Sequence, residues 1–141
     1  MSKAFGLAGL KVGYMIASET VLQAFSSLNL PLRPTTPSVY AAMEALKDIE
    51  YMERNVALVT EERERVRREA SNIGVEVYPS NTNFLLMRTS ISDAAKKLKE
   101  LGVMVFDPSS QLPPEFIRVS IGTQEENNLF LSSLKQILNV G

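Results

Sequence analysis

A long helical pattern between residues 36 and 73 constrains the fold of this chain more than any other feature. It begins with Thr36 as a capping residue and Pro37 in the first turn, and it ends before Gly74, a typical helix terminator. Six apolar residues at three- and four-residue spacing share one face: Met52, Val56, Val59, Val66, Ala70 and Ile73. A helix with one apolar stripe buries that stripe, so the pattern predicts an amphipathic helix lying on a sheet.

The other faces of this helix carry charges of both signs. Glutamates and arginines between residues 61 and 69 can pair at three- and four-residue separations, and Arg63 is the single charged residue on the apolar side. A coiled-coil seam is the alternative, but the pattern is short for one. Because an uninterrupted helix of this length is uncommon in a compact domain, we expect a break near Tyr51 or Met52.

Strand patterns follow Gly74. Residues 75–78 alternate, residues 83–88 form a nearly continuous apolar run typical of a central strand, and residues 116–122 alternate again. We also expect a short strand at 103–106.

Further elements surround these strands. The sequence predicts a buried strand at 10–17, a helix from the cap Ser18 to about residue 28, and a connection at 29–34. Capping boxes predict helices at 90–101 and 123–139. The fold class is therefore α/β, in the form of an α+β small domain with helices packed on a small, mostly antiparallel sheet.

Composition excludes several classes of protein. Of 141 residues, 45% are apolar and 22% charged, which is typical of a globular chain and not of a disordered one. The net charge of −1 gives no reason to expect nucleic acid as a partner. Cysteine and histidine are absent, which argues against a metal site and histidine-dependent catalysis. No apolar run is long enough to cross a membrane, so we expect no membrane association and a cytoplasmic location.

The opening stretch, residues 2–14, combines a lysine with small, apolar and glycine residues. An amine in dry surroundings is a nucleophile for carbonyl carbon once it is neutral, which indicates Schiff-base chemistry for Lys3. Ser2 and Lys11 are residue types that hold a phosphate. On composition alone, a solvated loop lysine is the simpler interpretation.

Arg118 lies in the middle of the strand predicted at 116–122, on the face opposite Ile117 and Val119. An arginine among apolar residues needs an anionic partner. One candidate is a structural ion pair with an acid such as Glu115. The other is a bidentate clamp for a substrate carboxylate, which suits the planar guanidinium.

Two sequence motifs resemble those of the class I/II (fold-type I) pyridoxal-phosphate aminotransferases: SKAFGLAGLKVGY at residues 2–14 and FIRVSIGTQEE at residues 116–126. The likeness is greatest to the histidinol-phosphate aminotransferases and covers almost the whole chain. It implies that Lys3 binds the cofactor aldehyde and moves the substrate proton. It also implies that Ser2 and Lys11 hold the cofactor phosphate, and that Arg118 holds the substrate carboxylate. Lys11 occupies the position where the family has an arginine. An ammonium cannot form the two parallel hydrogen bonds that a guanidinium donates to a phosphate.

The same resemblance implies a domain organisation and a reaction. Residues 1–48 would be a remnant of the large cofactor-binding domain, and residues 49–141 the C-terminal small domain. The intact parent would be a homodimeric transaminase of histidine biosynthesis, acting on small amino and keto acids, with histidinol phosphate and 2-oxoglutarate as the pair. Histidinol-phosphate aminotransferases often carry an arginine for the substrate phosphate near the strand before the 107–114 loop, but here the sequence reads Val105-Phe106-Asp107. The alternatives are a non-catalytic dimerisation module and a lyase or decarboxylase of the same fold.

Overall fold

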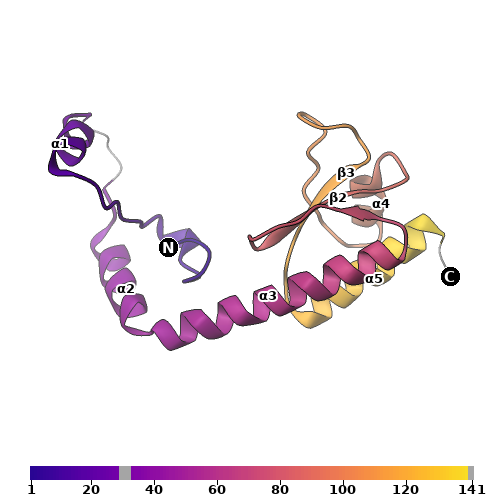
Figure 1. The fold of residues 1–141 in the computed structure, drawn as a ribbon, viewed down its shortest axis with the longest axis horizontal. Coiled ribbons are helices and arrows are strands. Elements are labelled where there is room, and N and C mark those ends of the chain that lie inside the picture. Colours follow the sequence, from indigo (N-terminus) through magenta and orange to yellow (C-terminus); the bar gives the residue numbers. More distant parts are fainter. Residues whose placement is uncertain (29–32, 140–141) are drawn as a thin grey trace. The chain divides into compact units, whose positions relative to one another are not determined.

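A computed structural model describes residues 1–28 and 33–139 as two compact units, Met1–Val56 and Ala57–Gly141 (Figure 1). The first four residues of the connection predicted at 29–34 therefore lie outside the described residues. No helix within the described ranges is long and apolar enough to span a membrane.

The first unit contains a short 3-10 turn and helices. The turn η1 covers Ala8–Leu10, α1 covers Glu19–Ser27, and α2 covers Thr36–Lys47. The helix α3, Ile49–Asn72, begins in this unit and continues into the second. The helix predicted after Ser18 is confirmed, although the Ser18 side chain makes no capping hydrogen bond.

The strand predicted at 10–17 is wrong. Lys11 has a left-handed backbone with φ of 50°, which ends η1, and residues 12–18 have no regular structure. Ile16 is 88% exposed. An apolar, β-branched run becomes a strand only where a neighbouring strand pairs with its backbone, and within the described residues this segment has no such neighbour.

The long helical pattern is interrupted earlier than predicted. Asp48, with φ of −102° and ψ of 62°, separates α2 from α3, so the expected break at Tyr51 or Met52 is displaced towards the N-terminus. The Asp48 carboxylate accepts a hydrogen bond from the Tyr51 N–H at 3.1 Å and so caps the following helix. At the other end of α2 the capping residue is Thr35, one residue before the predicted Thr36.

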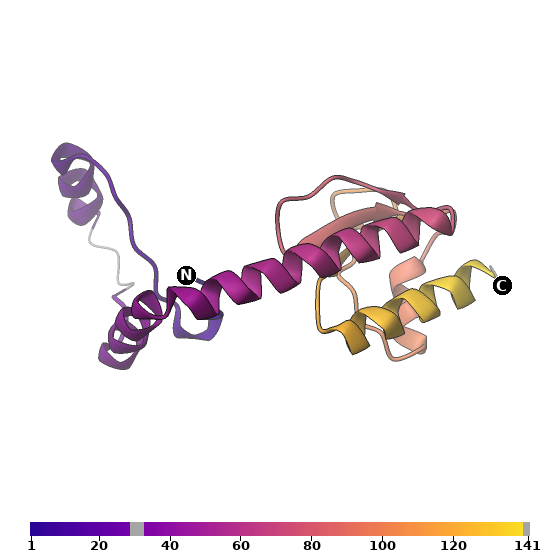
Figure 2. The same cartoon turned by 60° about the horizontal axis from the view of Figure 1, so that its bottom comes forward.

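The second unit is built on a three-stranded antiparallel sheet in the order β1-β2-β3. The strands are β1 at Glu76–Val77, β2 at Phe84–Arg88 and β3 at Phe116–Ser120, with α4 at Ala94–Glu100 and α5 at Gln124–Leu138. Gly74, with φ of 84°, ends α3 as predicted. Helices packed on a small antiparallel sheet confirm the predicted fold class (Figures 1 and 2).

One face of the sheet forms the core. Leu85 and Met87 of β2 and Ile117 and Val119 of β3 are at most 5% exposed and pack against α3, α4 and α5. Their neighbours in each strand point to the opposite, open face, as period-two alternation requires. The alternation predicted for β3 is therefore confirmed.

Two local predictions in this unit fail. The segment 103–106 is not a strand: only Phe106 forms an isolated bridge, to Arg118. The capping box predicted at 90–93 is also absent, because Asp93 adopts a left-handed φ of 62° and its side chain makes no capping bond. The capping box between Thr123 and Glu126 is confirmed at the start of α5.

A polar network joins α3 to the rest of the second unit. Asn127, 2% exposed, donates to the Glu62 carboxylate at 2.8 Å, and Arg65 binds the same carboxylate at 2.8 Å. Arg63, the charged residue on the apolar side of α3, donates to the Thr82 carbonyl at 3.0 Å. Its burial is thus offset by a hydrogen bond to the loop that precedes β2.

Candidate functional site

The residues singled out from the sequence lie in two different units. Ser2, Lys3 and Lys11 belong to the first unit, and Arg118 belongs to the second. Each group is therefore described by itself.

Ser2 and Lys3 lie in one turn at the start of the chain. The Gly6 N–H donates to the Lys3 carbonyl at 3.0 Å, and Gly6 has a φ of 68° that favours glycine. The Leu7 N–H donates to the Met1 carbonyl at 3.4 Å. These two bonds close a turn that contains the consecutive residues Ser2, with its hydroxyl, and Lys3, with its amine.

The surroundings of this turn differ from the expectation. Lys3 was expected in dry surroundings, but the side chains of Ser2 and Lys3 are exposed. Lys11, at the end of η1, is exposed as well, and its N–H donates to the Ala8 carbonyl at 3.4 Å. Neither lysine belongs to an ion pair formed within residues 1–28 and 33–139. The first unit thus offers a hydroxyl and two amines to a ligand.

Arg118 lies on the open face of the sheet and is exposed. The ion-pair alternative does not hold, because no carboxylate of the described residues lies within 4.0 Å of its guanidinium nitrogens. Glu115, the acid considered for that pair, instead has a buried Oε2 with no hydrogen-bond partner among these residues. The guanidinium of Arg118 is therefore open to an external anion.

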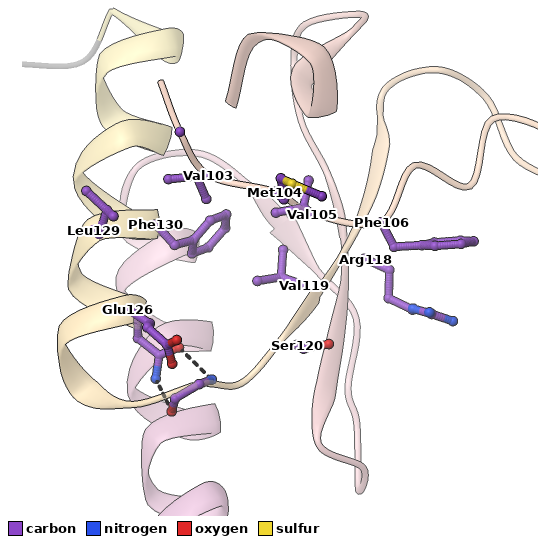
Figure 3. A pocket seen from close by; sticks show the side chains of 13 residues that line it. Val103, Met104, Val105, Phe106, Arg118, Val119, Ser120, Glu126, Leu129 and Phe130 are labelled. Carbon is purple, nitrogen blue, oxygen red and sulfur yellow. Dashed lines mark hydrogen bonds between the residues drawn. The ribbon is translucent and has the colours of Figure 1, made fainter. Parts of the chain in front are cut away.

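Two phenylalanine rings, which sequence reasoning missed, contact the Arg118 guanidinium. Its Cζ lies 4.1 Å from the ring centre of Phe106 and 5.0 Å from that of Phe84. Figure 3 shows the Phe106 side chain extending alongside Arg118. The backbones of Phe106 and Arg118 exchange two hydrogen bonds of 3.0 Å, which fixes this pair. Phe84 lies at the start of β2 and faces Ser120.

A cavity of about 410 Å³ adjoins Arg118 within the second unit (Figure 3). Its walls are the segment 102–106, the end of β3 and the first turns of α5. Asn127 fixes the corner between β3 and α5, because its amide accepts from the Gly122 N–H at 3.0 Å and donates to the Gly122 carbonyl at 3.1 Å. A Cβ at Gly122 would collide with the Glu126 carboxylate, so a side chain here would displace that carboxylate from its hydrogen bond with the Thr123 N–H.

Acid–base properties near the corner follow from the same network. Hydrogen bonding from Arg65 holds the pKa of Glu62 below its ordinary value of 4.5; burial opposes this shift, and the Asn127 amide adds to it. On the open face, the carboxylate of Glu76 raises the pKa of the Tyr78 phenol. Neither Glu62 nor Tyr78 accepts a hydrogen bond from Arg118, so these two side chains leave the guanidinium N–H donors of Arg118 available.

Comparison with known proteins connects these features to one family. Residues 1–134 match the family model "Aminotransferase class I and II". The chain is 40% identical over 138 residues to histidinol-phosphate aminotransferase 1 of Archaeoglobus fulgidus, covering 97% of this chain and 43% of that protein. The chain thus spans about two fifths of the length of the curated relatives it matches.

Solved structures show the same relationship. The histidinol-phosphate aminotransferase of Clostridium acetobutylicum matches with a TM-score of 0.82 at 28% identity, covering 99% of this chain and 44% of that one. That of Sinorhizobium meliloti, solved in complex with pyridoxal-5′-phosphate, matches with a TM-score of 0.84 at 26% identity, covering 98% and 39%.

Proposed function

We propose, from the premise that this chain belongs to the family of class I and II aminotransferases, that it is the C-terminal portion of a pyridoxal-phosphate-dependent transaminase. The observation that carries the proposal is the exposed guanidinium of Arg118 on the open face of β3, within a chain that matches the family over residues 1–134. This guanidinium forms no ion pair with the part of the chain that the structure describes. The intact parent acts as an enzyme, and the 141-residue chain alone is inactive.

In this proposal the chain contains parts of two domains. Residues 1–48 belong to the large cofactor-binding domain and residues 49–141 to the small C-terminal domain. The first unit supports this division, because its buried residues within the described ranges are Ser38 and Ala42, whereas Ile16 and Tyr40 are 88% and 64% exposed. Apolar surface of this kind is covered in a larger domain. The parent works as a cytoplasmic homodimer, as the family resemblance implies.

The residues of the opening turn fit pyridoxal phosphate. Lys3 supplies a primary amine for the cofactor aldehyde, while the Ser2 hydroxyl and the Lys11 ammonium are phosphate ligands, and all three are exposed. When bound, the cofactor supplies an electron sink that stabilises a carbanion at the substrate α carbon. The Lys3 amine would take up the proton that this carbon loses.

The proposed substrates are histidinol phosphate and 2-oxoglutarate. The first follows the names of the relatives, such as the Archaeoglobus protein, and the second follows the resemblance drawn from the sequence. Histidinol phosphate has no carboxylate, so the clamp at Arg118 serves the keto acid and the amino acid formed from it. A planar guanidinium with no ion-pair partner among residues 1–28 and 33–139 binds such a carboxylate through two parallel N–H donors.

Mixing the chain with pyridoxal phosphate tests the role of Lys3. We expect an imine absorption band, and after borohydride reduction we expect mass spectrometry to locate the pyridoxyl group on Lys3. Lys3→Ala should remove both signals, whereas Lys96→Ala, a change at another exposed lysine, should leave them unchanged. Equal labelling of both lysines would refute a specific cofactor site in this chain.

A non-catalytic module is the second candidate, and the exposed apolar residues of the first unit favour it. The apolar side chains exposed in that unit can be covered by a second copy of the chain without cofactor. Analytical ultracentrifugation with and without pyridoxal phosphate separates the two candidates. A dimer that is indifferent to the cofactor and lacks the Lys3 signal would support the module.

A further inference from the structure

We propose that Phe84 and Phe106 are positioning residues for Arg118, and that their rings hold the guanidinium in the orientation that binds a substrate carboxylate. The inference rests on the proposed function, because it concerns the same clamp. It adds two residues that neither the motif nor the family match assigns.

The rings reach Arg118 from opposite sides of its strand. Phe84 belongs to β2, which pairs with one edge of β3, and Phe106 belongs to the segment that bridges the other edge. Arg118 lies between them, with its Cζ 5.0 Å and 4.1 Å from the two ring centres. The close-up in Figure 3 shows the Phe106 member of this arrangement at the rim of the cavity.

The contacts stabilise the cation without neutralising it. An aromatic face attracts a guanidinium through its quadrupole but accepts none of its in-plane N–H bonds, so those donors remain available. Arg65 shows the opposite case, because Glu62 and Glu69 take its donors at 2.8 and 2.9 Å. Arg118 is thus stabilised by groups that leave its binding edge free.

Order is the second contribution of the rings. Arginine has many rotamers, and freezing them on binding weakens affinity. The reciprocal 3.0 Å backbone bonds between Phe106 and Arg118 set the position of the ring, and the ring restricts the side chain before a ligand arrives. A guanidinium held beside two rings in this way loses less side-chain entropy when a carboxylate binds to its N–H donors.

The chain contains a matched control. Phe116 lies on the same strand and face as Arg118, but its ring contacts Tyr78 and Arg88, with Arg88 Cζ at 5.9 Å from the ring centre. Phe116→Leu therefore removes the same atoms from the same face without changing the environment of Arg118.

Nuclear magnetic resonance of the ¹⁵N-labelled chain tests the inference through the Arg118 Nε–Hε signal, assigned by its loss in Arg118→Lys. We titrate 2-oxoglutarate at constant ionic strength. Phe106→Leu and Phe84→Leu should each move the free signal towards that of a solvated arginine, since one ring remains, and weaken binding about fivefold, the size expected for an exposed cation–π contact. Phe106→Tyr, which keeps a ring, should retain both properties, as should Phe116→Leu.

Each other outcome overturns a defined statement. If binding depends on Arg118 but is unchanged in both leucine variants, the positioning role is wrong and the carboxylate clamp of the proposed function stands. If Arg118→Lys does not alter binding, or the native chain binds no 2-oxoglutarate, the clamp itself fails and the positioning role falls with it. An equal loss in Phe116→Leu would show a general effect on the sheet and would also overturn the inference.

Discussion

The two faces of the small sheet use neighbouring residues of one strand for opposite purposes. On the covered face, Ile117 and Val119 are 0% and 5% exposed and pack against helices. On the open face, Arg118 is exposed and contacts two aromatic rings, with no acid among the described residues within ion-pair distance. Burial stabilises the first face, whereas the second keeps a cation available. The comparison indicates that β3 divides its two tasks between alternate residues. The odd-numbered residues stabilise the fold, and the even-numbered Arg118 is available for ligand binding.

The largest expected effect on stability comes from the covered face. Ile117→Ala should lower the free energy of unfolding by about 2–5 kcal/mol, because it removes a fully buried side chain and leaves a cavity. Arg118→Ala, one residue along the same strand, should lower it by about 1–2 kcal/mol, the size of two exposed cation–π contacts. Urea unfolding followed by far-UV circular dichroism measures both. Equal losses would contradict the division between the faces.

A smaller effect is expected at the corner between β3 and α5. Asn127→Ala removes the hydrogen bonds to Gly122 and Glu62, so the free energy of unfolding should fall by about 1–3 kcal/mol. Asn128→Ala is the matched control, because Asn128 is exposed, and it should cost no more than about 0.5 kcal/mol. Thermal unfolding of both variants provides the measurement. A neutral Asn127→Ala would show that the corner does not support the sheet.

The smallest effect concerns pH. Since Arg65 lowers the pKa of Glu62 in the folded chain, Glu62 contributes stability that is present above its ordinary pKa of 4.5 and is lost as the pH falls through the lower, folded value. Glu62→Gln should cost below about 1 kcal/mol at neutral pH, and the cost should vanish in acid. Unfolding curves from neutral pH to below 4.5 test this, with Glu61→Gln, at an exposed position, as control. A difference that persists in acid would argue against the linkage.

Much of the fold was predictable because its signals are local. The apolar stripe that ends at Gly74 identified the C-terminal part of α3, and alternation identified both faces of β3. The capping box at Thr123 located the start of α5. The failures were positions where local pattern and tertiary pairing disagree. Residues 10–17 and 103–106 have strand-like composition, but strands require partners, and only Phe106 of the second segment has one.

The candidate site divides in the same way. Lys3 and Arg118 could be identified from the sequence because each lies in a recognisable motif. Lys3 is the amine of the first motif, and Arg118 is a cation in the middle of a predicted strand. Phe84 and Phe106 did not, because they reach Arg118 only through strand register, from positions 34 and 12 residues away along the chain. The roles assigned to Ser2, Lys3, Lys11 and Arg118 stay predictions.

By itself, the amino-acid sequence determined the apolar face of the long helix, the alternation of buried and exposed residues in β3, and the family to which the chain belongs. Each of these is a property of residue order. Tertiary structure alone decided that Arg118 lies beside two rings and beside no described acid. The physical reason is that the energy of a cation depends on which groups surround it in space, and those groups come from strands brought together by folding.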